Sequence, residues 1–157
     1  MPATAANAPQ GAAQHELIIT RTFDAPRALV FRAWTQAEHM VRWMGPMNYT
    51  CISAKMDLRL GGAYRIGIRS PDGKEHWMRG IYQEIVEPER LAFSFSWEKE
   101  GEYGRENTIT ITFSDEAGKT RMKFRQAFFE TAENRDDHNK GWSSSFDNLA
   151  QYLAGAR

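Results

Sequence analysis

The chain has 157 residues, of which 41% are hydrophobic and 25% are charged, as is typical of one soluble globular domain. Its 20 basic and 20 acidic residues give a net charge of +0, which argues against a nucleic-acid-binding protein with a broad basic surface. No apolar run approaches the roughly 20 residues of a membrane span, so no membrane partner is expected. The single cysteine, Cys51, cannot form an intrachain disulfide, which fits a reducing cytoplasm.

Residues 1–14 are mostly Ala, Pro, Gln, Gly and Asn. They lack the basic region and the apolar core of a signal peptide, which again indicates a cytoplasmic protein. We predict a disordered N-terminal tail over residues 1–14 and a single domain over residues 15–157, because the sequence shows no internal repeat and no second linker.

The first part of the domain predicts one strand and two short helices. Residues 16–23 alternate apolar and polar side chains as a strand does. The segment 24–26, Asp-Ala-Pro, opens a helix, because proline in the first turn lacks only an N–H that would be unpaired there. Residues 35–38 form a capping box that predicts a second helix with Thr35 as its N-cap. This helix ends at Gly45-Pro46.

Residues 48–130 predict strands separated by turns. The turn signals lie at residues 61–62, 70–73, 87–89, 101–104 and 115–118. They delimit six strands in an antiparallel meander. Alternation along these strands predicts one apolar and one wet face, and it places Phe128 on the apolar face with Met122 and Phe124.

The last element is predicted as a long helix over residues 135–154. Its apolar residues Trp142, Phe146, Leu149 and Leu153 recur at helical spacing on one face. A helix of this length spans roughly 30 Å, enough to cover the whole sheet. Its first half carries Gly141 and three serines at 143–145. Small residues over large aromatic strands can leave a cavity instead of a filled core.

Motifs along the chain together resemble one known family. They are Arg21-x-Phe23-x-Ala25-Pro26 with Trp34 and Trp43, Asp57-x-Arg59-x-Gly61-Gly62-x-Tyr64, Gly80-x-Tyr82-x-Glu84-Ile85, Pro88-x-Arg90-Leu91 and Gly141-Trp142. Over residues 16–153 the sequence resembles the family named after the activator of heat-shock-protein-90 ATPase, within the START-like, or SRPBCC, superfamily. The resemblance implies an α+β helix-grip fold, as in pollen allergens. In this fold a seven-stranded antiparallel sheet wraps around a long C-terminal helix, with two short helices after the first strand.

The residues that could carry chemistry do not form a convincing catalytic or metal-binding set. The histidines are His15, His39, His76 and His138, and no two of them have the spacing of metal ligands on one turn. Cys51 has no second cysteine, and no serine lies in a nucleophile-elbow pattern. No metal, no cofactor and no catalytic residue is therefore predicted.

The resemblance also implies an apolar cavity between the sheet and the last helix, the feature that lipid carriers, hormone carriers and polyketide cyclases of the superfamily share. Most aromatic residues must fill the core, but some are candidates to line this cavity. The candidate ligand-binding residues are Trp43, Tyr64, His76, Met78, Phe93, Phe95, Trp97, His138, Trp142 and Ser145. A strand phase shifted by one residue would replace His76 and Met78 by Trp77 and Arg79.

These observations favour a protein that binds a small apolar or aromatic molecule. Two alternatives stay open: an enzyme of the polyketide cyclase or dehydratase type that uses the same cavity, and a chaperone-associated interaction module. The last is disfavoured because the chain has no room for the separate activating domain of the co-chaperone. The sequence names neither the ligand nor the oligomeric state, and a homodimer is one of the states it allows.

Overall fold

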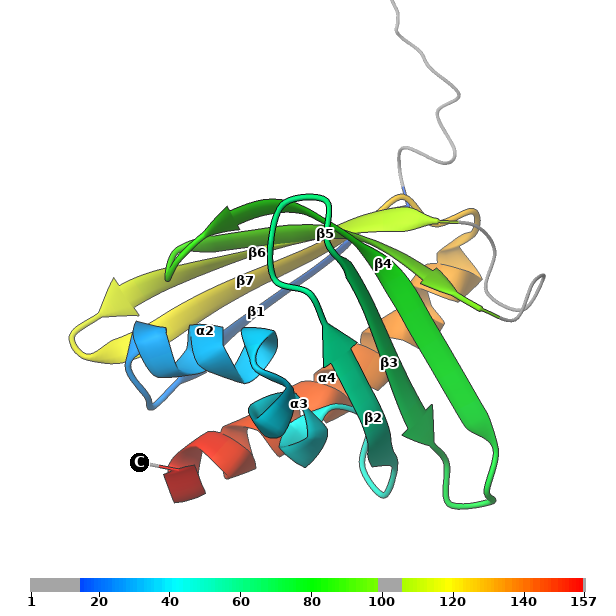
Figure 1. Cartoon of the computed structure of the whole chain (residues 1–157), viewed down its shortest axis with the longest axis horizontal. Helices are drawn as coiled ribbons and strands as arrows, with labels where there is room; N and C mark the ends of the chain where they lie inside the picture. Colours follow the sequence, from blue (N-terminus) through cyan, green and yellow to red (C-terminus); the bar gives the residue numbers. More distant parts are fainter. Residues whose placement is uncertain (1–14, 99–105, 157) are drawn as a thin grey trace, which may run out of the picture.

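The computed structural model describes residues 15–98 and 106–156, and this part of the chain forms one sheet and three helices (Figure 1). The elements are β1 (Leu17–Phe23), α2 (Arg27–Thr35), α3 (Ala37–Trp43), β2 (Thr50–Met56), β3 (Ala63–Arg69), β4 (Glu75–Val86), β5 (Arg90–Trp97), β6 (Asn107–Glu116), β7 (Lys119–Ala127) and α4 (Ala132–Ala156). The predicted tail at 1–14 and the predicted turn at 101–104 lie outside the described residues.

The sheet has seven strands in the order β1-β7-β6-β5-β4-β3-β2, and every neighbouring pair is antiparallel. The strands curve over α4, which crosses the concave side of the sheet, while α2 and α3 close the remaining opening (Figure 1). The helix-grip fold expected from the resemblance is therefore confirmed.

The sheet is apolar on its concave face, as the alternation predicts. Ile109, Ile111 and Phe113 on β6 are at most 2% exposed, and Met122 and Phe124 lie opposite them on β7.

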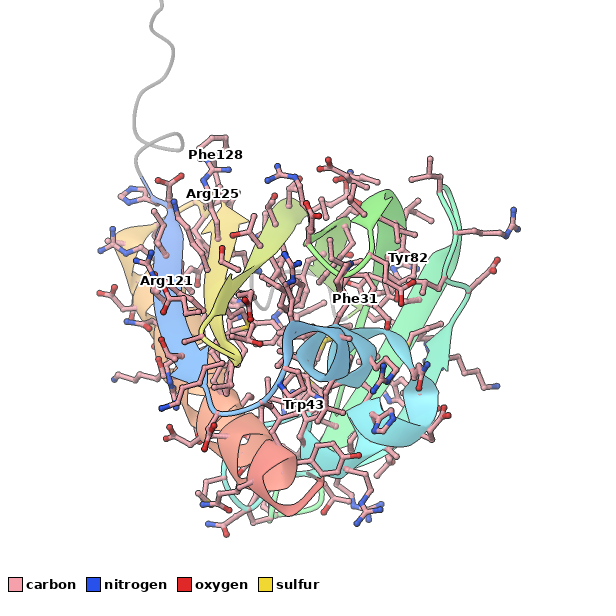
Figure 2. The ribbon with its side chains drawn as sticks, turned by 90° about the vertical axis from the view of Figure 1, so that its left-hand side faces the viewer. Phe31, Trp43, Tyr82, Arg121, Arg125 and Phe128 are labelled. Atoms are coloured by element: carbon pink, nitrogen blue, oxygen red, sulfur yellow. The ribbon has the colours of Figure 1, made fainter. Side chains whose placement is uncertain are left out.

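The placement of Phe128 on the apolar face is wrong. Strand β7 ends at Ala127, so the alternation stops there and Phe129 is buried instead. Phe128 is 46% exposed and lies next to Arg125 at the outside of the molecule (Figure 2).

The two short helices are confirmed, but the capping box between them is not formed. Thr35 is the last residue of α2, and its hydroxyl donates to the carbonyl of Phe31 at 2.9 Å. The N-cap of α3 is Gln36, which makes no side-chain capping bond. The buried Thr35 hydroxyl already satisfies a carbonyl of the preceding helix, so it does not serve the helix that follows.

Helix α4 is fixed to the sheet by a buried polar chain as well as by apolar packing. The indole N–H of Trp142 donates to the side-chain oxygen of Gln126 at 2.9 Å, and the Gln126 amide donates to Asn107 at 3.0 Å. These two hydrogen bonds connect the first half of α4 to β7 and, through Gln126, to β6. Phe146, Leu149 and Leu153 continue the buried face toward the C-terminus.

Candidate functional site

A pocket of about 210 Å³ lies between the first half of α4, strands β3–β5 and the connection from α3 to β2. Helix α4 supplies five of its lining residues, and the strands and the connection supply the others. The lining residues are Met44, Gly45, Pro46, Tyr49, Ile68, His76, Met78, Trp97, Asp137, His138, Gly141, Trp142 and Ser145. We call this space the outer pocket.

Two small residues, Gly141 and Ser145, open the helical wall of the outer pocket beside Trp142, as the serine- and glycine-rich half of the last helix suggested. A Cβ atom added at Gly141 would meet only Cγ of Pro46, at 4.0 Å, so the space above Gly141 is open. Ser145 is 3% exposed, and its hydroxyl donates to the carbonyl of Gly141 at 2.9 Å. The Ser145 oxygen can still accept a hydrogen bond on the pocket side.

The sheet wall has the strand phase that turns His76 and Met78, and not Trp77 and Arg79, toward the outer pocket. His76 and Met78 on β4 face the outer pocket. The alternative residue Trp77 lies on the opposite face, where its ring covers Gly67 and stands 3.9 Å from the guanidinium of Arg65. A side chain at Gly67 would collide with that ring at 2.6 Å, so the glycine makes room for Trp77 outside the pocket.

His138 joins the two walls. Its Nδ1 lies 2.8 Å from the carbonyl of Asn134, so this nitrogen carries the proton, and its Nε2 accepts from the indole N–H of Trp97 at 3.0 Å. Burial lowers the pKa of His138, and the Asn134 carbonyl and the negative charge of Asp137 oppose this shift only in part. The residue therefore presents a neutral ring to the pocket at neutral pH.

A smaller void of about 20 Å³, the inner chamber, lies behind the outer pocket. Met44, Met78 and Trp142 line both spaces and form the partition between them. The other lining residues of the inner chamber are Trp34, Met40, Tyr64, Ile66, Tyr82 and Phe93. Burial raises the pKa values of Tyr64 and Tyr82, so both phenols keep their protons.

The structure brings most of the candidate site residues to one of these two spaces. His76, Met78, Trp97, His138, Trp142 and Ser145 line the outer pocket, and Tyr64 and Phe93 line the inner chamber beside Met78 and Trp142.

Trp43 and Phe95 line neither space. Trp43 is a core residue whose indole N–H donates to the carbonyl of Ala33 at 2.9 Å. Phe95 packs its ring against those of Trp97, His138 and Trp142, and it therefore supports the wall without forming its surface.

Sequence reasoning missed Met44, Tyr49, Ile68 and Asp137. Ile68 could have been found, because it shares the strand phase of Tyr64. Met44 and Tyr49 lie in the irregular connection from α3 to β2, whose path no periodicity predicts. Asp137 lies at the exposed rim, and an acidic residue near the start of a helix is ordinarily explained by the helix dipole alone.

Within residues 15–98 and 106–156, no three His, Cys, Asp or Glu side chains are grouped so that they could hold a metal ion. None of the helices in this part of the chain is long and apolar enough to cross a membrane.

The family model described as "Activator of Hsp90 ATPase homolog 1-like protein" matches residues 24–154, whereas no curated protein is significantly similar in sequence. A solved protein of Arthrobacter aurescens is 19% identical at a TM-score of 0.81, covering 95% of this chain and 90% of its own. A solved protein of Chromobacterium violaceum is 24% identical, with a TM-score of 0.80, and the match covers 88% of this chain and 96% of that protein. A solved protein of Silicibacter pomeroyi, which is itself called AHSA1, is 21% identical, with a TM-score of 0.79. The match covers 90% of this chain and 99% of that protein. The TM-scores show that these proteins share the fold of this chain.

Proposed function

This chain belongs to the activator of Hsp90 ATPase homolog 1-like family, and we propose that it binds one small apolar or aromatic molecule in the outer pocket. The observation that carries the proposal is the open space of about 210 Å³ beside Gly141, walled by Met78, Trp97 and Trp142. Protein cores are close-packed, and unfilled space in them is destabilising. This pocket opens to solvent at the rim where Asp137 lies, and its apolar walls would be covered by an apolar occupant.

The size and the polarity of the outer pocket limit the ligand. At about 210 Å³ the pocket is smaller than the roughly 300–1,000 Å³ of sites for drug-sized molecules, so a compact molecule of one to three rings fits best. Three of its polar residues lie on α4, where Asp137 and His138 are about two helical turns from Ser145 along the pocket wall. Such an arrangement orients a ligand that is otherwise held by apolar contacts.

Binding is favoured over catalysis of the cyclase or dehydratase type because the polar groups of His138 and Ser145 are already hydrogen-bonded within the protein. Both ring nitrogens of His138 are engaged, by Asn134 and by Trp97. The hydroxyl proton of Ser145 is directed to the Gly141 carbonyl. A general base needs an unoccupied lone pair within reach of its substrate, and the Nε2 lone pair of His138 is taken by the Trp97 N–H. A chaperone-associated role rests on the family name alone.

The test fills the open space from the helix side. Gly141→Leu places a branched side chain in the outer pocket, and Gly155→Leu makes the same change on α4 where a Cβ meets nothing within 4 Å. Binding of the neutral fluorescent probe N-phenyl-1-naphthylamine is titrated for each folded variant. The wild type and Gly155→Leu should bind the probe alike, and Gly141→Leu should bind at least about tenfold more weakly. If both variants bound the probe with equal affinity, the probe would bind at a site other than the outer pocket.

A further inference from the structure

Trp34 carries a buried hydrogen-bond donor without an acceptor. Its indole nitrogen is the one buried side-chain polar atom among the described residues that has no partner. The other four of the five tryptophans each donate to an acceptor: Trp43 to Ala33, Trp77 to Glu75, Trp97 to His138 and Trp142 to Gln126. Buried donors are rarely left unpaired in folded proteins, so this exception calls for a physical explanation.

The Trp34 ring is held in place on several sides. It packs edge-on against Trp43 at 4.9 Å between centroids and against Phe146 at 6.0 Å, and it stacks on Phe124 at 6.4 Å. The residue is 2% exposed and lines the inner chamber. The packing of the ring therefore fixes the position of its N–H, and the ring borders the inner chamber.

The inner chamber can be joined to the outer pocket by side-chain movement alone. Of the three residues in the partition, Trp142 is pinned by its hydrogen bond to Gln126. Met44 and Met78 are unbranched and flexible, and methionine readily changes rotamer to fit what it contacts. Rotation of these two side chains would extend the outer pocket toward Trp34 without any change in the backbone.

We propose that the inner chamber receives the polar end of the ligand, and that a neutral acceptor such as a carbonyl oxygen accepts a hydrogen bond from Nε1 of Trp34. This inference rests on the proposed function, because the apolar part of the same molecule fills the outer pocket. The Tyr64 hydroxyl cannot replace Trp34 as the donor, since it already donates to the Ser94 carbonyl at 2.8 Å. A carboxylate is excluded, because Ile66 and Phe93 line the chamber and an unpaired charge is costly to bury there.

The test uses two probes of the same shape. Acetophenone has a carbonyl oxygen that can accept a hydrogen bond, and α-methylstyrene has a CH₂ group in place of that oxygen. Both are titrated as competitors of N-phenyl-1-naphthylamine, and the ratio of their affinities is compared between variants. Trp34→Phe should lower the preference for acetophenone about 2- to 10-fold, as expected for the loss of one hydrogen bond. Trp77→Phe, the same change on the outer face of the sheet, should leave the ratio unchanged.

A second measurement uses the unaltered protein and so does not depend on the folding of Trp34→Phe. With ¹⁵N-labelled tryptophan, acetophenone should move the indole proton resonance of Trp34 downfield, α-methylstyrene should not, and the Trp43 resonance serves as the internal control. Equal responses to both probes, or an unchanged affinity ratio in Trp34→Phe, would overturn the Trp34 contact while the outer pocket stands. If the dye binds to the wild type but neither probe displaces it, this inference is overturned and the outer pocket stands. If the dye itself does not bind, the proposed function fails and this inference with it.

Discussion

The indole N–H of Trp97 donates a hydrogen bond of 3.0 Å to Nε2 of His138. This bond connects β5 to α4 across the wall of the outer pocket. Because Nδ1 of His138 is bonded to the Asn134 carbonyl, a second proton on the ring could bind only at Nε2, where it would displace the indole N–H. The contact between sheet and helix at this point therefore depends on a neutral histidine.

The stability of the fold should fall as the pH is lowered through the titration of His138. Burial lowers the pKa of His138 below its ordinary value of 6.5, whereas in the unfolded chain the ordinary value applies. Between these two values the unfolded chain binds more protons, so acid favours unfolding. The contribution of the neutral histidine is complete above about pH 6.5 and is lost progressively below it.

The measurement is the urea midpoint between about pH 7.5 and pH 5, for the wild type and for His138→Gln, which does not titrate in this range. The wild-type midpoint should fall more steeply than that of the variant. Parallel curves for the two proteins would show that a group other than His138 causes the loss.

Gly141→Ala should stabilise the protein. Glycine in a helix interior costs up to about 1 kcal/mol relative to alanine, and the new Cβ would touch only Pro46, at 4.0 Å. We expect the free energy of unfolding to rise by about 0.5–1 kcal/mol, measured by urea denaturation. Gly155→Ala is the control near the end of the same helix, where fraying reduces the gain. A decrease for Gly141→Ala would mean that the wall of the outer pocket is closed at this point.

Much of this architecture follows from periodicity, and the exceptions have physical reasons. The alternation of Ile109, Ile111 and Phe113 and the helical spacing around Trp142 predict their burial, because a side chain in a regular element points where its position dictates. Phe128 and Met44 lie just beyond the ends of β7 and α3, where that rule no longer applies.

The unpaired indole N–H of Trp34 could not be predicted from the sequence either. Periodicity indicates that Trp34 is on the apolar face of its helix. It does not indicate whether the indole N–H meets an acceptor, since that depends on residues far away in the chain.

Trp34, whose indole N–H has no acceptor, can be compared directly with Trp43, whose indole N–H is hydrogen-bonded. Both are 2% exposed, and their rings touch, but only Trp43 has an acceptor, the Ala33 carbonyl. Replacement by phenylalanine should therefore cost about 0.5–1.5 kcal/mol more at Trp43 than at Trp34, because only there is a hydrogen bond lost. Urea unfolding of the two variants without ligand gives the difference, and equal losses would indicate that the Trp34 N–H is bonded after all, for example to a buried water.

Trp142 should be indispensable to the attachment of α4. Its ring packs on Phe124 at 4.8 Å and on Phe146 at 5.7 Å between centroids, and its N–H donates to Gln126 at 2.9 Å. Truncation of a large buried aromatic costs about 3–5 kcal/mol, a large part of the roughly 5–15 kcal/mol that stabilises a domain.

Trp142→Ala should therefore be poorly folded at moderate temperature, as measured by near-ultraviolet circular dichroism and thermal unfolding. Trp77→Ala, which removes the same side chain from the outer face of the sheet, should unfold within a few degrees of the wild type, because little of the core is lost. If Trp142→Ala kept the wild-type midpoint, the packing of Phe146 and Leu149 would have to hold the helix alone. The Trp142–Gln126 bond would then contribute nothing to the attachment of α4.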